Sequence, residues 1–209
     1  MKVAIIGASG FIGTEILKEA LGRGHEVTAI VRNPSKITIT DPHLTVKEGD
    51  VSNEATVASL VAGNDAVISA YNSHDTDTYV KAIQAIINGV KKAGIKRLLV
   101  VSGAGSLEVA PGLQLLDTPE FPAEWKGGAS ATREAFRVLQ ADKDLEWTAL
   151  SPAAMIAPGE RTGKFRLGKD QLLTDSNNKS SISTADYAIA MIDELEKPQH
   201  IRARFTVAY

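Results

Sequence analysis

Apolar and polar residues alternate along this chain with two different spacings, which predicts a repeated succession of strands and helices. The first apolar run, Val3–Ile6, is rich in β-branched residues and ends at a glycine, as a buried strand does. Beyond Gly13, apolar residues return every three or four positions, which is the spacing of an amphipathic helix. Further strands are expected at 25–31, 44–47, 65–70, 97–101, 145–150 and 204–209, and further helices at 53–61, 78–92, 129–141 and 184–196.

Strands that alternate with helices in this way form a parallel sheet that is covered by helices on both faces. We therefore predict an α/β fold with a doubly wound parallel sheet, in a single domain over residues 1–209. Ser52 or Asn53 is expected to cap the helix that ends at 61, and Thr184 the last helix. Because ligands bind at the carboxyl ends of the strands in such a sheet, the residues that follow each strand are the functional candidates.

Two stretches interrupt the strand–helix pattern. Residues 106–128 contain three prolines and several large apolar side chains, and loops of this length inside a compact domain are usually functional. They either cover a sheet edge or form a lid over a bound ligand. Residues 155–181 are rich in glycine and polar residues, with short strands expected at 164–167 and 171–174. We interpret this second stretch as a small C-terminal elaboration on the substrate side.

The turn after the first strand carries three glycines with the spacing G-x-x-G-x-x-G, namely Gly7, Gly10 and Gly13. Gly7 would let the chain leave the strand sharply, and Gly10 would let backbone amides approach a pyrophosphate. Gly13 would let the helix pack close to the sheet, and the helix dipole would attract an anion. An ordinary glycine-rich turn is the alternative, but the position between strand and helix favours dinucleotide binding.

The residues after the second strand indicate which dinucleotide is bound. A carboxylate there would bind the ribose 2′-hydroxyl of NAD, whereas an arginine would pair with the 2′-phosphate of NADP. The sequence reads Arg32-Asn33-Pro34-Ser35-Lys36 and has no acid at this point. NADP(H) is therefore favoured over NAD(H), with a solvated basic turn as the alternative. Asp50 and Val51, after the third strand, are expected to lie near the adenine.

Composition and charge exclude several classes of function. The net charge is -2 and the basic residues are dispersed, so neither nucleic acid nor an anionic membrane is an expected partner. The chain has no cysteine, which excludes disulfides and thiolate catalysis, and its four histidines are scattered, which disfavours a metal site. With no leader-like segment and no apolar run long enough to span a bilayer, we expect a soluble cytoplasmic protein, either monomer or homodimer.

A group of motifs spread over nearly the whole chain resembles one family. They are GASGFIG, VRNPSK, GD at 49–50, VVSGAGS, FPAEWK, LEWTALSPAAMIAPGERTG and the segment from Ile182-Ser183 to Tyr187. The chain thereby resembles the atypical short-chain dehydrogenases with a Rossmann fold, specifically the bacterial NADH-flavin reductases related to biliverdin reductase B and the NmrA-like proteins. The resemblance is specific for fold and cofactor, and less specific for substrate.

The resemblance also implies where the cofactor binds. The pyrophosphate would lie on Gly7, Ser9, Gly10, Phe11 and Ile12, and the 2′-phosphate on Arg32. The adenine would lie beside Asp50 and Val51, the ribose beside Ala70 and Tyr71, and the nicotinamide beside Ser102, Pro152 and Ala153. Gly103 is a further candidate for cofactor binding.

The chain lacks the usual catalytic pair of short-chain dehydrogenases, a tyrosine followed four residues later by a lysine that lowers its pKa. None of its four tyrosines has a lysine at that position. This tells against ketone reduction and sugar epimerisation. A flavin or quinone accepts the hydride into its own conjugated ring, and its proton can come from water. Ser102 and Tyr71 are then the catalytic candidates, with His74 as a further proton donor at the same rim.

Each of these residues also has a simpler interpretation. Ser102 could merely close the turn after its strand, and a loop histidine such as His74 is usually solvated. Gly159–Phe165 looks like a phosphate loop, but it is one residue short and has no Ser or Thr after Lys164. We predict an NAD(P)H-dependent oxidoreductase that transfers a hydride to a small-molecule flavin, quinone or similar acceptor. The alternative is a non-catalytic NADP(H) sensor of the NmrA-like type.

Overall fold

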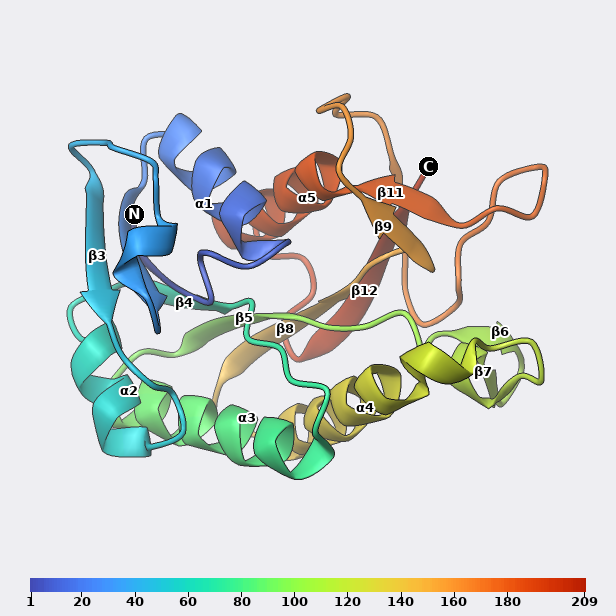
Figure 1. Cartoon of the computed structure of the whole chain (residues 1–209), viewed down its shortest axis with the longest axis horizontal. Coiled ribbons are helices and arrows are strands. Elements are labelled where there is room, and N and C mark those ends of the chain that lie inside the picture. The colour runs from blue at the N-terminus through green and yellow to red at the C-terminus, as the bar shows by residue number, and fades with distance from the viewer.

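An eight-stranded sheet runs through the middle of the molecule, with helices on both of its faces (Figure 1). The computed structural model describes all residues, 1–209. The sheet is formed by β1 (Lys2–Ile6), β2 (Glu26–Val31), β3 (Leu44–Glu48), β4 (Ala66–Ser69), β5 (Arg97–Val101), β8 (Glu146–Ser151), β10 (Arg166–Gly168) and β12 (Ala203–Ala208). Their order is β10-β12-β8-β5-β4-β1-β2-β3, and every neighbouring pair is parallel except β10 with β12.

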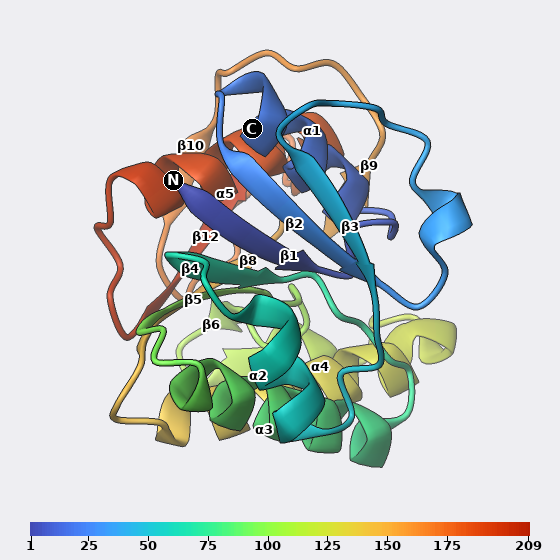
Figure 2. The ribbon, with the colours of Figure 1, turned by 90° about the vertical axis from the view of Figure 1, so that its left-hand side faces the viewer.

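The helices lie in two layers, one on each face of the sheet (Figure 2). One layer holds α1 (Gly13–Gly22) and α5 (Thr184–Glu196), and the other holds α2 (Glu54–Val61), α3 (Thr76–Lys92) and α4 (Lys126–Ala141). Alternate residues of β1 enter the two cores, since Val3 and Ile5 pack with α1 whereas Ala4 and Ile6 pack with α3. The predicted doubly wound parallel sheet is therefore confirmed, with one antiparallel edge strand added.

Helix starts differ from the predicted ones by up to three residues, and capping side chains explain the starts of α2 and α3. The largest difference is at α4, which begins at Lys126 without a side-chain cap. Asn53 caps α2 by accepting hydrogen bonds from the next turn, which agrees with one of the two expected caps. Asp75 caps α3, so this helix begins at Thr76. The prediction that Thr184 caps α5 is wrong, because the Ser183 side chain accepts the hydrogen bond from the Asp186 amide.

Short strands account for the remaining differences. Two small sheets were not predicted: β6 (Glu108–Ala110) with β7 (Leu113–Gln114), and β9 (Met155–Ala157) with β11 (Ser181–Ser183). A strand does form near 164–167, as β10. The strand expected at 171–174 is absent, because only Gln171 pairs, in a single bridge with Glu108. No helix of the chain has both the length and the apolar character that crossing a membrane requires.

Candidate functional site

The carboxyl ends of β1 and β4 meet the start of α1 so closely that only glycine fits between them. Gly7 has φ +77°, and a Cβ atom on it would lie 2.7 Å from the carbonyl oxygen of Ala70. A Cβ atom on Gly13 would lie 2.1 Å from the carbonyl oxygen of Gly7. A side chain at either position would force the strands and the helix apart. The backbone therefore depends on the glycines that the sequence pattern singled out.

Unpaired backbone amides gather at the start of α1. The amides of Phe11, Ile12 and Gly13 donate to no acceptor within the protein, and no side chain caps this helix end. Three free N–H groups at the positive end of a helix dipole form an anion site. The residues present thus fit a dinucleotide pyrophosphate. The Phe11 side chain, 57 % exposed, stands on the surface next to this site.

A cavity of about 280 Å³ lies beside the glycine turn, and we call it the cofactor cavity. Its lining comprises Ile6, Gly7, Ser9, Gly10, Ile30, Val31, Arg32, Asn33, Lys36, Gly49, Asp50, Val51, Ala70, Tyr71 and Asn72. Most of the residues between positions 7 and 71 that were predicted to bind the cofactor therefore line this one cavity. Phe11 and Ile12 contribute their amides at its edge, and Asn72 was missed by the sequence analysis.

The charge of the cofactor cavity is positive on balance. Arg32 and Lys36 are both exposed, and neither forms an ion pair with a side chain of the protein. Asp50 faces them, and hydrogen bonds from Ser52, together with the positive charge of Arg32, hold the pKa of its carboxyl below the usual value. Two cations and one carboxylate suit a ligand that carries an additional phosphate.

Tyr71 is half-buried at the wall of the same cavity. Its ring packs edge to face on Tyr79 with 5.5 Å between ring centroids, and the Tyr79 hydroxyl donates to the Tyr71 carbonyl at 2.9 Å. Burial raises the pKa of the Tyr71 hydroxyl above its ordinary value of 10.0. The hydroxyl is therefore protonated at neutral pH and can donate a hydrogen bond, but it cannot act as a base.

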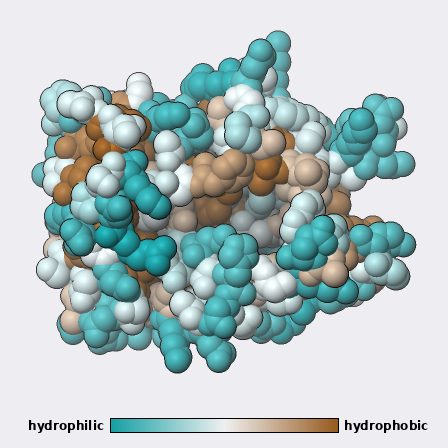
Figure 3. Space-filling model, viewed as in Figure 1, coloured by the Kyte–Doolittle hydropathy of each residue, from teal (hydrophilic) through white to brown (hydrophobic).

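A second cavity of about 400 Å³ lies beyond the carboxyl ends of β5 and β8, and we call it the acceptor cavity. Apolar surface around a hollow is visible near the middle of the face in Figure 3. Its lining comprises Asn72, His74, Gly103, Ala104, Gly105, Leu115, Thr118, Glu120, Phe121, Pro122, Glu124, Trp125, Gly128, Ala129, Thr132, Pro152, Ala153, Ala154, Met155 and Ile156. Asn72 lines both cavities, so the two adjoin at this residue.

Residues 115–125 of the long loop form one wall of the acceptor cavity. Leu116 is buried and its amide donates to the Gly105 carbonyl at 2.8 Å, while the Asp117 carboxylate pairs with Arg133 at 3.0 Å. Phe121 and Trp125 line the cavity. Both interpretations of this loop thus find support, because one part anchors it to the body of the protein and another part covers a ligand-sized space.

Ser102 and His74, two residues considered for catalysis, are placed differently. The Ser102 hydroxyl is buried, has no hydrogen-bond partner and faces a small internal void beside Tyr79 and Thr132. It lines neither cavity in this rotamer. His74 does line the acceptor cavity, and its Nδ1 lies 2.8 Å from where a Cβ atom of Gly128 would be. The absence of a side chain at Gly128 thus gives His74 its place against α4.

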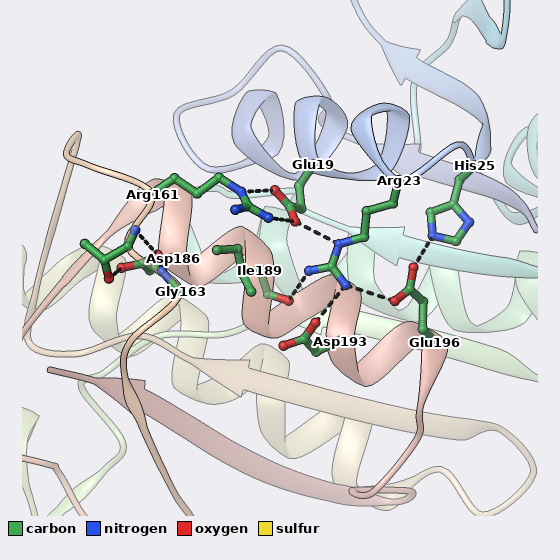
Figure 4. A network of polar contacts seen from close by, with 10 residues as sticks. Glu19, Arg23, His25, Arg161, Gly163, Asp186, Ile189, Asp193 and Glu196 are labelled. Carbon is green, nitrogen blue, oxygen red and sulfur yellow. Dashed lines mark hydrogen bonds and ion pairs between the residues drawn. The ribbon is translucent and has the colours of Figure 1, made fainter.

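The segment that resembles a phosphate loop is occupied by a carboxylate of the protein itself. The amides of Thr162 and Gly163 both donate to Asp186 at 2.8 Å, and Arg161 binds Glu19 through two hydrogen bonds of 2.8 Å (Figure 4). Asp186 is fully buried. These donors therefore already have an anionic partner, which agrees with the rejection of a phosphate loop here.

Comparison with known proteins agrees with this geometry. A family model described as "NAD(P)H-binding" matches residues 7–198. "Uncharacterized protein YwnB" of Bacillus subtilis is 48 % identical and covers 99 % of this chain and 98 % of its own. Two solved structures each cover 100 % of this chain: a "putative epimerase" of Bacteroides thetaiotaomicron (51 % identity, 96 % of that chain, TM-score 0.96) and a "putative NADH-flavin reductase" of Streptococcus pneumoniae (39 % identity, 99 % of that chain, TM-score 0.88). The chain therefore belongs to the NAD(P)H-binding family, with the Rossmann fold of the atypical short-chain dehydrogenases.

Proposed function

We propose that this protein is an NADPH-dependent reductase that transfers a hydride to a flavin, a quinone or a similar conjugated acceptor. One observation carries the proposal. The positively charged cofactor cavity and the largely apolar acceptor cavity, of about 400 Å³, adjoin at Asn72. When bound, the cofactor supplies the hydride. A cavity of this size and lining suits a planar aromatic molecule held beside the nicotinamide.

The protein's own residues position the two reactants rather than exchange protons with them. The amides at the start of α1 hold the pyrophosphate, and Arg32 with Lys36 holds the 2′-phosphate. Phe121 and Trp125 pack against the acceptor ring and exclude water from its face. Such positioning, at close contact between donor and acceptor atoms, provides a large part of the rate enhancement in reactions of this kind.

The missing tyrosine–lysine pair supports a conjugated acceptor over a ketone or a sugar. Reduction of a ketone places negative charge on one oxygen atom, which needs an acid beside it. Tyr71 has no adjacent lysine and an elevated pKa, and the Ser102 hydroxyl faces the interior. A flavin or quinone spreads the charge over its ring and can take its proton from solvent. The same absence tells against the chemistry named for the "putative epimerase" of Bacteroides thetaiotaomicron.

Turnover of NADPH with different acceptors tests the proposal. Purified protein should oxidise NADPH faster than NADH in the presence of riboflavin, FMN or a small quinone, with saturation in both substrates. Trp125→Ala should raise the acceptor KM by about tenfold while the cofactor KM stays within about twofold, because an aromatic contact to the acceptor is lost. Leu113→Ala, an exposed residue of the same loop outside the lining, is the matched control.

Two further variants address the catalytic candidates. Ser102→Ala and Tyr71→Phe each remove one hydroxyl, and a fall in kcat with either would assign that group to the reaction. If the protein binds NADPH tightly and turns over none of the acceptors, the reductase is excluded and the non-catalytic NADP(H) sensor is the better description. The presence of an acceptor-sized apolar cavity beside the cofactor cavity supports the reductase over that sensor.

A further inference from the structure

The acidic residues Glu120 and Glu124 are the charged Asp, Glu, Lys or Arg residues in the lining of the acceptor cavity. Glu120 and Glu124 line the cavity, both are exposed, and neither forms an ion pair or a side-chain hydrogen bond. No lysine or arginine lines this cavity. The adjoining cofactor cavity has the opposite character, because Arg32 and Lys36 line it. The charge of the lining side chains therefore changes from positive in the cofactor cavity to negative in the acceptor cavity.

We infer that the acceptor cavity selects uncharged acceptors over phosphorylated ones, and thus riboflavin or a neutral quinone over FMN. This inference rests on the proposed function and specifies its substrate class. The phosphate ester of FMN carries a charge of about -1.5 to -2 at neutral pH. A flavin in this cavity would have Glu120 and Glu124 among its neighbours, so a phosphate on its side chain would meet two unpaired carboxylates. The phosphates of the cofactor at α1 add further negative charge to the same cleft.

One feature of the cavity acts in the opposite direction. The start of α4 faces it, since Gly128, Ala129 and Thr132 belong to the lining, and the positive end of a helix dipole attracts anions. Glu124 lies in the 3-10 turn, Ala123–Trp125, that leads directly into α4. A carboxylate at this place already offsets the dipole of the helix. The side chains that line the cavity therefore keep a net negative charge, and the exposed Lys126 at the start of α4 lies outside the lining.

His74 is the remaining titratable group of the lining. All proteins are therefore compared at the same pH, so that His74 contributes equally to each measurement. A change in discrimination between the unmodified protein and a variant of Glu120 and Glu124 then reports on the two carboxylates.

The test compares riboflavin with FMN at saturating NADPH. The kcat/KM ratio of riboflavin to FMN should be on the order of tenfold at low ionic strength and fall to about threefold at about 0.15 M salt, because salt screens exposed charges. The double variant Glu120→Gln with Glu124→Gln removes both carboxylates, so the ratio of riboflavin to FMN should fall to about one. Glu146→Gln removes the same charge from the opposite edge of the sheet, at the start of β8, and should leave the ratio as in the unmodified protein.

Binding provides a second readout that does not need turnover. Quenching of flavin fluorescence, in the presence of unreactive NADP⁺, gives the dissociation constants of riboflavin and FMN, and their ratio should follow the kinetic one. The inference is overturned if FMN binds or reacts as well as riboflavin, or if the double variant keeps the ratio of the unmodified protein. Absence of turnover with a preserved binding ratio would overturn the proposed function and leave the selectivity of the cavity established.

Discussion

At the scale of single residues, Arg32 is the residue that we propose selects between the two nicotinamide cofactors. It follows β2, lines the cofactor cavity and forms no ion pair with another side chain. A guanidinium group can donate two parallel hydrogen bonds to a phosphate, whereas it has no comparable partner on a ribose hydroxyl. Its contribution should therefore be confined to the phosphorylated cofactor.

Replacement of this residue gives a sharp prediction. Arg32→Asp should raise the dissociation constant of NADPH on the order of a hundredfold, because a charge-assisted pair becomes a repulsive one. The dissociation constant of NADH should change by less than about threefold, since the 2′-hydroxyl is uncharged. Titration calorimetry measures both. Lys96→Asp, the same charge change at the amino edge of the sheet, is the control, and an equal loss for both cofactors would refute the assignment of Arg32 to the 2′-phosphate.

The sequence reveals some residues of the site and conceals others for physical reasons. Gly7 and Gly13 could be predicted because a strand-to-helix turn that tight tolerates no side chain, which is a local requirement. Glu120 could not be placed, because it reaches the acceptor cavity through an irregular loop without periodicity. The direction of the Ser102 hydroxyl depends on a single side-chain torsion, which no pattern of residues reports.

At the scale of elements, a network of ion pairs joins α1 to α5 and to the loop after β9 (Figure 4). Glu19 of α1 accepts from Arg23 at 2.8 Å and from Arg161 of the loop at 2.8 Å. Arg23 also binds Asp193 of α5 at 2.7 Å. Glu19 is buried, so its charge depends on both arginines. The helix whose first amides are unpaired is thus fixed to two other segments.

The network predicts a pH-dependent contribution to stability. The hydrogen bond from Arg161 holds the pKa of Glu19 below its ordinary value of 4.5. A carboxylate with a lowered pKa stabilises the folded state at pH values above its ordinary pKa. This stabilisation is lost as the pH falls from the ordinary pKa through the lowered one. Glu19→Gln should therefore lower the free energy of unfolding at neutral pH by about 1–2 kcal/mol. The difference should shrink as urea denaturation is repeated toward about pH 3.5.

A matched variant separates this effect from a loss of helix charge. Glu15 lies on the same helix and pairs only with Lys18, at 2.7 Å on the surface. Glu15→Gln should change the free energy of unfolding by less than about 0.5 kcal/mol, as for most exposed ion pairs. A difference for Glu19→Gln that stays constant down to acidic pH would contradict the role given to its ionised carboxylate.

The long elements could be predicted from the sequence, whereas the shortest ones could not. The strands of the sheet's centre are buried on both faces and therefore have continuous apolar runs, such as Ala66 to Ile68 of β4. By contrast, β9 and β11 have three residues each, too few to show an alternation. Their pairing depends on the path of the chain between them. The 171–174 stretch shows the opposite case, because a strand was predicted there but no partner strand pairs with it beyond one bridge at Gln171.

At the scale of the whole molecule, the bound cofactor would contact the ends of strands from both halves of the sheet. The cofactor cavity lies at β1, β2, β3 and β4, and the predicted nicotinamide residues Pro152 and Ala153 follow β8. A ligand that binds across the sheet, and binds only the folded state, raises the free energy of unfolding of the whole domain.

Thermal unfolding tests this consequence. NADPH at about a hundred times its dissociation constant should add about 2.7 kcal/mol to the free energy of unfolding and raise Tm by about 5–10 °C. NADH at the same concentration should raise Tm less, and Arg32→Asp should remove the difference between the two cofactors. Differential scanning fluorimetry gives these values. Equal shifts for both cofactors with the unmodified protein would contradict the preference for NADPH.

Asn72 divides the linings of the two cavities along the chain. Every residue that lines the cofactor cavity lies at or before Asn72, and every residue that lines the acceptor cavity lies at or after it. Substitutions, insertions or recombination within 106–128 can therefore alter the acceptor cavity and leave the residues of the cofactor cavity unchanged. The proposed reductase could thus change its oxidant during evolution and keep the same electron donor.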